Sequence, residues 1–131
     1  MDKISFRNTN GDYIKEFLNI DVMLDAYPCA GSGTTFDALF MGVPVVTFYN
    51  ERRNTRVGLS IFKQFGLEGL AVPINEPQNY IERAVGLAND LSALDALHKN
   101  LRNMFLNSEG YWSIFQKIQT VHVSSILTVQ R

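Results

Sequence analysis

The chain has 131 residues, of which 46% are hydrophobic and 19% are charged, and its 12 basic side chains nearly balance 13 acidic ones. This length predicts one domain with a core of its own, and the charge balance gives no basic excess that would indicate binding to nucleic acid or anionic lipid. The single cysteine, Cys29, excludes an intramolecular disulfide and a multi-cysteine metal site. With no apolar signal sequence and no run of about 18 apolar residues, the sequence predicts a cytoplasmic protein without a membrane segment.

The first part of the chain predicts two strands, each followed by a helix. Apolar residues on one face indicate the first helix, and Gly42 is expected to end the second. The strands are expected at residues 3–6 and 20–25, and the helices at residues 12–18 and 34–41.

The second part continues the alternation of strand and helix. Residues 43–48 form the clearest strand, because they are β-branched and continuous, as in a parallel strand that is covered on both faces. After a polar loop, a helix is expected over residues 56–65, ending at Gly66, then a brief fourth strand at residues 70–73. Two helices follow, from Pro77 and over residues 91–105, and the last ten residues are helix or a frayed end. Four strand–helix alternations with short connections predict an α/β fold with a mainly parallel sheet.

One loop carries the strongest indication of a ligand site. The sequence from Asp25 to Asp37 reads D-A-Y-P-C-A-G-S-G-T-T-F-D, between a predicted strand and a predicted helix. In open parallel sheets, ligands bind beyond the carboxyl ends of the strands. The two glycines let backbone come close to a ligand, and the exposed N–H groups of the first helical turn suit a phosphate. The candidate nucleotide-binding residues are Gly31, Ser32, Gly33, Thr34, Thr35 and Asp37.

A purely structural role for these residues is the alternative. Thr34 followed three residues later by Asp37 is close to a capping box, in which both side chains satisfy backbone donors at the helix start. A carboxylate at Asp37 would also repel a diphosphate at this helix end. That conflict eases if Asp37 points sideways to accept hydrogen bonds from ribose hydroxyls, while backbone and threonine hydroxyls contact the phosphates. The loop matches neither the Walker pattern nor G-x-G-x-x-G, so the residues alone leave both interpretations open.

Several blocks of sequence, taken together, resemble one family. They are D-V-M-L-D-A-Y-P from Asp21, G-S-G-T-T-F-D-A-L-F-M-G-V-P-V-V-T from Gly31, R-V-G from Arg56 and Y-I-E-R-A-V-G-L-A-N-D from Tyr80. In this order they resemble the C-terminal region of O-GlcNAc transferases and their SPINDLY-like relatives in plants and bacteria, over about residues 3 to 115.

The resemblance implies a fold and a function. Enzymes of this family have the GT-B architecture of two Rossmann-like lobes, and the C-terminal lobe binds UDP-GlcNAc, the donor substrate, without a metal or another cofactor. Residues 1–131 are then expected to be a fragment of that lobe, a partial Rossmann-like, three-layer α/β unit with about four strands. By the resemblance, Gly31 to Thr35 lie against the donor diphosphate and Asp37 contacts the ribose. The implied activity is transfer of GlcNAc to a protein acceptor by an inverting enzyme, with no catalytic residue assigned.

The chain also departs from the family pattern. Relatives often carry threonine or histidine where this chain has Ser32 and Gly33, so side-chain donors are missing. The match begins at what looks like the fourth strand of the lobe, and the isolated chain is therefore expected not to transfer sugar and to self-associate through an exposed sheet edge. Two alternatives stay open: the lobe of another GT-B enzyme, such as a glycan glycosyltransferase or an epimerase, or a non-catalytic nucleotide-binding or scaffold module.

Other reactive side chains are expected to have structural roles. His98 and His122 lack partners at metal-ligand spacing, and Cys29 is expected to pack as a small apolar residue. Asp25 is expected to organise the loop that follows it. Arg56 is left open between binding a phosphate and pairing with a nearby acid such as Glu51.

Overall fold

A computed structural model describes residues 13–108 of the chain. Its strands are β1 (Met23–Leu24), β2 (Val45–Tyr49) and β3 (Ala71–Pro73), and its α-helices are α1 (Gly33–Phe40), α2 (Val57–Phe65), α3 (Pro77–Asn89) and α4 (Leu91–Leu106). Short 3-10 helices cover Tyr13–Asn19, Arg53–Thr55 and Glu68–Leu70. The strand expected at residues 3–6 and the tail beyond Ser108 lie outside the described residues.

The sheet is parallel, as predicted, with strand order β1-β2-β3. Met23 pairs with Val45 in the first ladder, and Thr47 pairs with Ala71 in the second. The described residues contain three strands where the sequence predicts about four, because the first predicted strand lies outside them. All three strands therefore end at the same edge of the sheet, the edge at which ligands bind in open parallel sheets.

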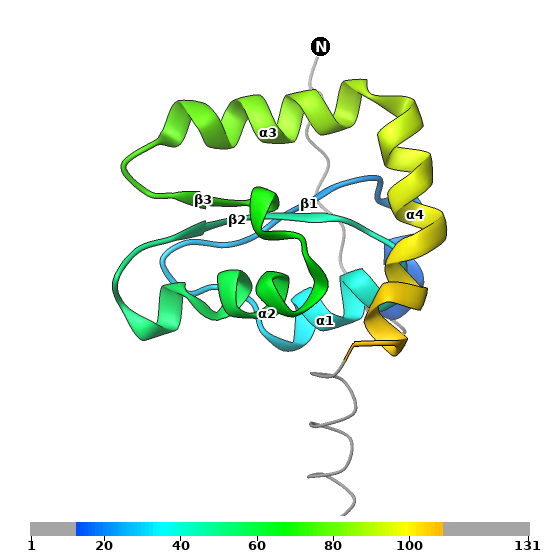
Figure 1. The fold of residues 1–131 in the computed structure, drawn as a ribbon, viewed down its shortest axis with the longest axis horizontal. Coiled ribbons are helices and arrows are strands. Elements are labelled where there is room, and N and C mark those ends of the chain that lie inside the picture. Colours follow the sequence, from blue (N-terminus) through cyan, green and yellow to red (C-terminus); the bar gives the residue numbers. More distant parts are fainter. Residues whose placement is uncertain (1–12, 109–131) are drawn as a thin grey trace, which may run out of the picture.

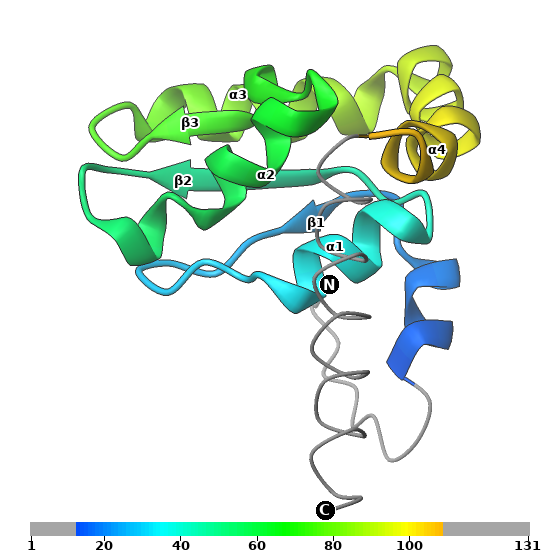
Figure 2. The ribbon, with the colours of Figure 1, turned by 60° about the horizontal axis from the view of Figure 1, so that its bottom comes forward.

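Helices cover both faces of the sheet, which confirms the three-layer α/β arrangement. Figure 1 shows α1 and α2 below the strands and α3 above them, with α4 across one end. α2 and α3 both contact β2 and β3, and α4 packs against α1 and α3. Figure 2 shows the same layers after rotation. Among the helices of residues 13–108, none is long and apolar enough to cross a bilayer.

The core lies mainly on the α1 and α2 side of the sheet. Its buried members are Phe17, Ala38, Leu39, Val43, Val45, Ile61, Phe62, Phe65, Leu67, Leu101 and Phe105. Burying a large apolar side chain stabilises a fold by roughly 1.5–3 kcal/mol. By contrast, α3 has no buried residue, and Ile81 and Val85 on it are 53% and 52% exposed. Within residues 13–108, the two faces of the sheet are therefore unequally covered.

Two predicted elements differ from the structure. The helix expected at residues 12–18 is a 3-10 helix, in which side chains three positions apart lie on the same side; Ile14 and Phe17 pack on the core in this way while Leu18 stays 72% exposed. The strand expected at residues 20–25 pairs only at Met23 and Leu24. The backbone N–H of Asp25 still donates to the carbonyl of Val46 at 2.9 Å, while its side chain bonds to the loop that follows.

Several predicted helix ends are confirmed. Gly42 and Gly66 follow α1 and α2 with φ of +85° and +69°, a backbone region that favours glycine. Pro77 is the first residue of α3, where a missing N–H costs nothing. Asp90 separates α3 from α4, and its side chain accepts the backbone N–H of Ala93 at 2.9 Å, so it caps the second helix.

Candidate functional site

The loop between β1 and α1 is organised by a buried carboxylate. Asp25 follows β1 and is only 8% exposed. Its Oδ1 accepts the backbone N–H groups of Ala26 and Gly31, both at 2.9 Å, and its Oδ2 accepts the hydroxyl of Thr47 at 2.7 Å. A buried carboxylate is costly unless donors surround it, and here three do. The prediction that Asp25 organises the loop is confirmed.

Gly31 is held on both of its backbone polar groups. Its N–H donates to Asp25, and its carbonyl accepts the hydroxyl of Thr35 at 3.0 Å. A Cβ at this position would lie 2.5 Å from Thr34 Oγ1 and 3.1 Å from Asp25 Oδ1, so the close approach requires glycine. A Cβ at Gly33 would meet nothing within 4 Å. Packing therefore explains the first glycine of the loop and not the second.

The start of α1 presents backbone donors. Ser32 occupies the N-cap without a side-chain cap bond, and its carbonyl accepts the N–H of Phe36 at 3.1 Å. Within residues 13–108, no acceptor bonds the N–H groups of Gly33, Thr34 or Thr35. The first two of these residues are exposed. These N–H groups, with the positive end of the helix dipole, form a site that favours an anion.

The structure separates the side chains of the two threonines. Thr34 is exposed, and its hydroxyl can reach a ligand at the helix start. Thr35 is completely buried, and its hydroxyl donates to Gly31. Thr35 therefore holds the loop with its side chain and can offer a ligand only its backbone N–H.

The alternative of a capping box between Thr34 and Asp37 is wrong. Thr34 is the second residue of α1, so it cannot be the N-cap, and Asp37 does not bond to that end of the helix. Instead, the carboxylate of Asp37 accepts a hydrogen bond from the hydroxyl of Tyr13. A carboxylate has about four acceptor sites, so one bond leaves capacity for ribose hydroxyls. Asp37 therefore bonds away from the start of α1, and its contact with a ribose stays a prediction.

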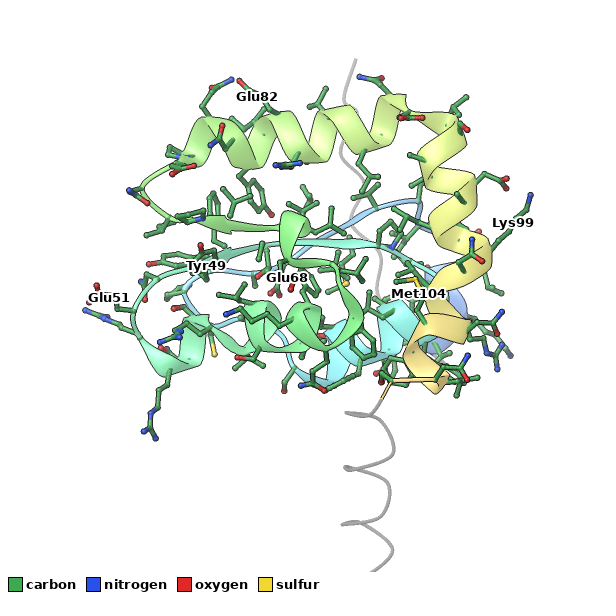
Figure 3. The ribbon with its side chains drawn as sticks, in the orientation of Figure 1. Tyr49, Glu51, Glu68, Glu82, Lys99 and Met104 are labelled. Atoms are coloured by element: carbon green, nitrogen blue, oxygen red, sulfur yellow. The ribbon has the colours of Figure 1, made fainter. Side chains whose placement is uncertain are left out.

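A second feature lies at the same edge of the sheet, beyond β2 and β3. It is an open pocket of about 410 Å³. Figure 3 shows Tyr49 and Glu51 of its lining at the end of β2. The lining residues are Tyr49, Asn50, Glu51, Arg56, Leu59, Pro73, Ile74 and Asn75. None of the residues from Gly31 to Asp37 lines this pocket, but Arg56, which the sequence left open as a phosphate-binding residue, does.

The loop that borders this pocket is held from within. Thr55 is 1% exposed, and its hydroxyl donates to Asn50 Oδ1 at 2.7 Å while accepting the Asn50 N–H at 3.2 Å. Asn50 Nδ2 also donates to the hydroxyl of Tyr27 at 3.0 Å, which joins this loop to the loop after β1. Arg56 lines the pocket, and among the described residues it forms no ion pair with Glu51. The proposed pairing of Arg56 with Glu51 is therefore not seen.

The remaining reactive side chains have simple environments. His98 bonds through Nε2 to the carbonyl of Asp21 at 3.0 Å, which fastens α4 to the segment before β1, as the predicted packing role requires. His122 lies outside the described residues. Cys29 is exposed, so the prediction that it packs as an apolar residue is wrong. In the part of the chain that the structure describes, no three side chains of His, Cys, Asp or Glu could together hold a metal ion.

Known proteins resemble the chain in sequence and in fold. The model of glycosyl transferase family 41 matches residues 7–117. A probable UDP-N-acetylglucosamine–peptide N-acetylglucosaminyltransferase SPINDLY from Hordeum vulgare is 34% identical over 108 residues, which are 82% of this chain and 11% of that protein. The protein of the same name from Solanum lycopersicum is 39% identical over 99 residues, 76% of this chain and 10% of the relative.

A solved structure agrees with these sequence matches. An O-GlcNAc transferase variant from Thermobaculum terrenum superposes with a TM-score of 0.66 at 34% identity, over 76% of this chain and 18% of that one. The chain thus spans about a tenth of the length of these curated relatives. The resemblance seen in the sequence is confirmed, and so is the α/β lobe that it implied. The chain belongs to glycosyl transferase family 41.

Proposed function

We propose that this chain is the part of a family 41 glycosyltransferase that binds the nucleotide sugar donor, UDP-GlcNAc. The diphosphate lies at the start of α1, against the segment from Gly31 to Thr35, and the ribose lies beside Asp37. The observation that carries the proposal is the exposed start of α1, where three N–H groups lack an acceptor within the described residues. Family membership and the position at the carboxyl edge of a parallel sheet support it.

The geometry suits the chemistry of sugar transfer. In the intact enzyme a protein hydroxyl attacks the sugar, the nucleotide leaves as UDP, and negative charge develops on the leaving diphosphate. Fixed N–H donors stabilise that charge without a metal or another cofactor, and they accelerate the reaction to the extent that they bind the transition state better than the ground state. Asp25 and Thr35 fix the loop beforehand, so little reorganisation is needed when the charge forms.

The proposal includes the rest of the enzyme. The relatives are about ten times longer than the matched region. We assign the second lobe of the GT-B architecture, the TPR repeats and the binding of the acceptor protein to the part of the enzyme outside this region. We propose a cytoplasmic location, because the chain has a single cysteine and no structural need for disulfides.

The isolated chain should bind UDP without transferring sugar, since the reaction takes place between two lobes. It should also self-associate. β1 is an outer strand of the described sheet, and Leu24 on it is 58% exposed. An open strand edge with apolar side chains beside it favours pairing with another chain.

Calorimetry with UDP tests the proposed site. Thr34→Ala should weaken UDP binding about tenfold, because a hydrogen bond to a charged group contributes about 1.5 kcal/mol or more. Ser60→Ala is the matched control: it removes an exposed hydroxyl near the start of α2 and should leave the affinity unchanged. In the full-length enzyme, loss of the same donor should lower turnover about 100-fold.

Other results would point elsewhere. If the unsubstituted chain does not bind UDP, or if both variants bind it equally well, the assignment of the diphosphate to α1 is wrong. UDP binding by a full-length protein that transfers no sugar would favour the non-catalytic module. Transfer to a glycan or small molecule in an acceptor screen would favour another GT-B enzyme.

A further inference from the structure

Thr47 is a polar side chain in the middle of the core strand. It lies in β2 and is fully buried, in a stretch where the neighbouring Val45 and Val46 are also fully buried. Its hydroxyl lies 2.7 Å from Asp25 Oδ2 and 3.2 Å from the carbonyl of Phe48. The shorter contact is with the carboxylate, and hydrogen bonds to charged acceptors are the stronger kind. The hydroxyl is therefore the donor through which β2 holds Asp25.

Helix α2 confines this side chain from the other side. A Cβ at Gly58 would lie 2.8 Å from Thr47 Cγ2 and 2.9 Å from its Oγ1, so the helix backbone comes as near as a glycine allows. Gly58 is itself buried. With α2 pressed against it, the threonine has little freedom to turn its hydroxyl away from Asp25.

The contacts form a continuous path from the core to the start of α1. Thr47 donates to one oxygen of Asp25, and the other oxygen accepts the Gly31 N–H. The Gly31 carbonyl accepts the Thr35 hydroxyl within the first turn of α1. Each of the three hydrogen-bond partners of the carboxylate among the described residues is a donor, which suits the acceptor-only group of an aspartate, and each lost donor loosens it.

We propose that Thr47 is a positioning residue for the donor diphosphate, acting through Asp25 and Gly31 on the N–H groups that open α1. The inference rests on the proposed function and adds a residue that touches no ligand. It makes the packing of α2 on β2 a determinant of nucleotide affinity, since Gly58 leaves the room that Thr47 needs to point at Asp25.

The test compares two substitutions of Thr47 in the 131-residue chain. Thr47→Val keeps the shape and removes the hydroxyl, whereas Thr47→Ser keeps the hydroxyl and removes a methyl group. Calorimetry gives the UDP dissociation constant, urea unfolding gives the stability, and NMR gives amide hydrogen exchange at Gly31, with the buried Leu39 of α1 as the reference for global opening.

We expect Thr47→Val to raise the UDP dissociation constant about tenfold and to speed exchange at Gly31 about tenfold relative to Leu39. Thr47→Ser should stay within about twofold of the unsubstituted chain in both measurements, even though it loses packing contacts. Should Thr47→Val fail to fold, Thr47→Ala provides a second variant without the hydroxyl, for which the same changes are expected.

The outcomes separate this inference from the proposed function. If the unsubstituted chain binds UDP and Thr47→Val binds it equally well, or if Thr47→Ser is as weak as Thr47→Val, the positioning role is refuted while the site stands. If the unsubstituted chain does not bind UDP, the proposed function fails. Amide exchange at Gly31 then still tests whether Thr47 holds the loop through Asp25. That link is refuted if Thr47→Val leaves the exchange rate at Gly31 unchanged.

Discussion

Two loops at the carboxyl edge of the sheet are held by the same kinds of side chain in different ways. After β1, Asp25 bonds a threonine of the neighbouring strand, Thr47. After β2, Asn50 bonds a threonine of its own loop, Thr55. Both threonines are buried, at 0% and 1% exposure. The first loop is thus fastened to the core strand, whereas the second is held mainly by bonds within itself and by one bond to Tyr27 of the first loop.

The difference fits the proposed roles of the two loops. The loop after β1 is tied through a charged acceptor to the rigid centre of the sheet, and it places the donors that open α1. Donors that must meet a ligand within a fraction of an ångström need such support. The loop after β2 satisfies its own polar groups in a 3-10 turn, Arg53–Thr55, and borders an open pocket. Its shape does not depend on a side chain from another strand.

Removing the side-chain acceptor of each loop should give the largest difference between the two loops in the free energy of unfolding. Asp25→Ala leaves three buried or partly buried donors without their acceptor, and we expect the free energy of unfolding to fall by about 3 kcal/mol. Asn50→Ala removes an acceptor from a half-exposed loop and should cost about 1 kcal/mol. Urea unfolding of the two variants measures both values.

Equal losses in the two variants would contradict the proposed difference, because the loop after β1 would then be no more strongly linked to the core than the other. UDP affinity provides a second measure. It should fall below detection in Asp25→Ala and change little in Asn50→Ala.

Substitutions at two glycines should give the next largest difference in the free energy of unfolding. Gly58→Ala would place a Cβ within 3 Å of Thr47, and we expect it to destabilise the chain by about 2 kcal/mol through overpacking. Gly33→Ala has open space around the new Cβ and a φ that suits any residue, so unfolding should change by less than about 0.5 kcal/mol.

The double variant Gly58→Ala with Thr47→Ser identifies the cause. Loss of Cγ2 should recover part of the stability lost in Gly58→Ala, as measured by urea unfolding. If the two substitutions are simply additive, the close approach of α2 to Thr47 is not the source of the loss.

Much of this fold could be predicted from local sequence. The continuous apolar character of β2, the glycines after α1 and α2 and the proline that opens α3 each act within a few residues, so a single segment specifies them. The length of β1 could not be predicted, because it is set by pairing with β2, whose partner residues Val45 and Val46 lie 22 residues away. An apolar strand pattern does not show where pairing stops.

The sequence predicted which residues form the candidate site better than it predicted how their side chains are arranged. The sequence indicated a phosphate-binding loop and a sideways Asp37, and it left the capping box open, since Thr34 and Asp37 have the same spacing in both cases. The N-cap at Ser32 and the bond from Tyr13 to Asp37 exclude the capping box, and neither follows from that spacing, while the ribose and phosphate contacts stay predictions. Thr47 was missed because it reads as an ordinary β-branched strand residue. Its only signal is an aliphatic hydroxyl between Val46 and Phe48 of the strand.

The smallest expected effect concerns the reach of the Asp25 charge. Tyr80 on α3 stacks on Phe48, with ring centroids 3.9 Å apart, and burial together with the negative charge of Asp25 raises its pKa above the usual 10.0. Because the folded pKa exceeds the unfolded one, the associated stabilisation is complete below about pH 10 and is lost as the pH rises through the folded pKa.

Asp25→Asn should therefore lower the pKa of Tyr80 while leaving it above 10.0, because burial, the larger cause, remains. Asn50→Ala, in the other loop, should not change it. Tyrosinate absorbance between pH 9 and 12, taken as the difference from Tyr80→Phe, isolates this residue among the five tyrosines. An unchanged pKa in Asp25→Asn would mean that the charge does not reach α3. The Asp25 carboxylate, which holds the loop after β1, would then act only through its three hydrogen bonds.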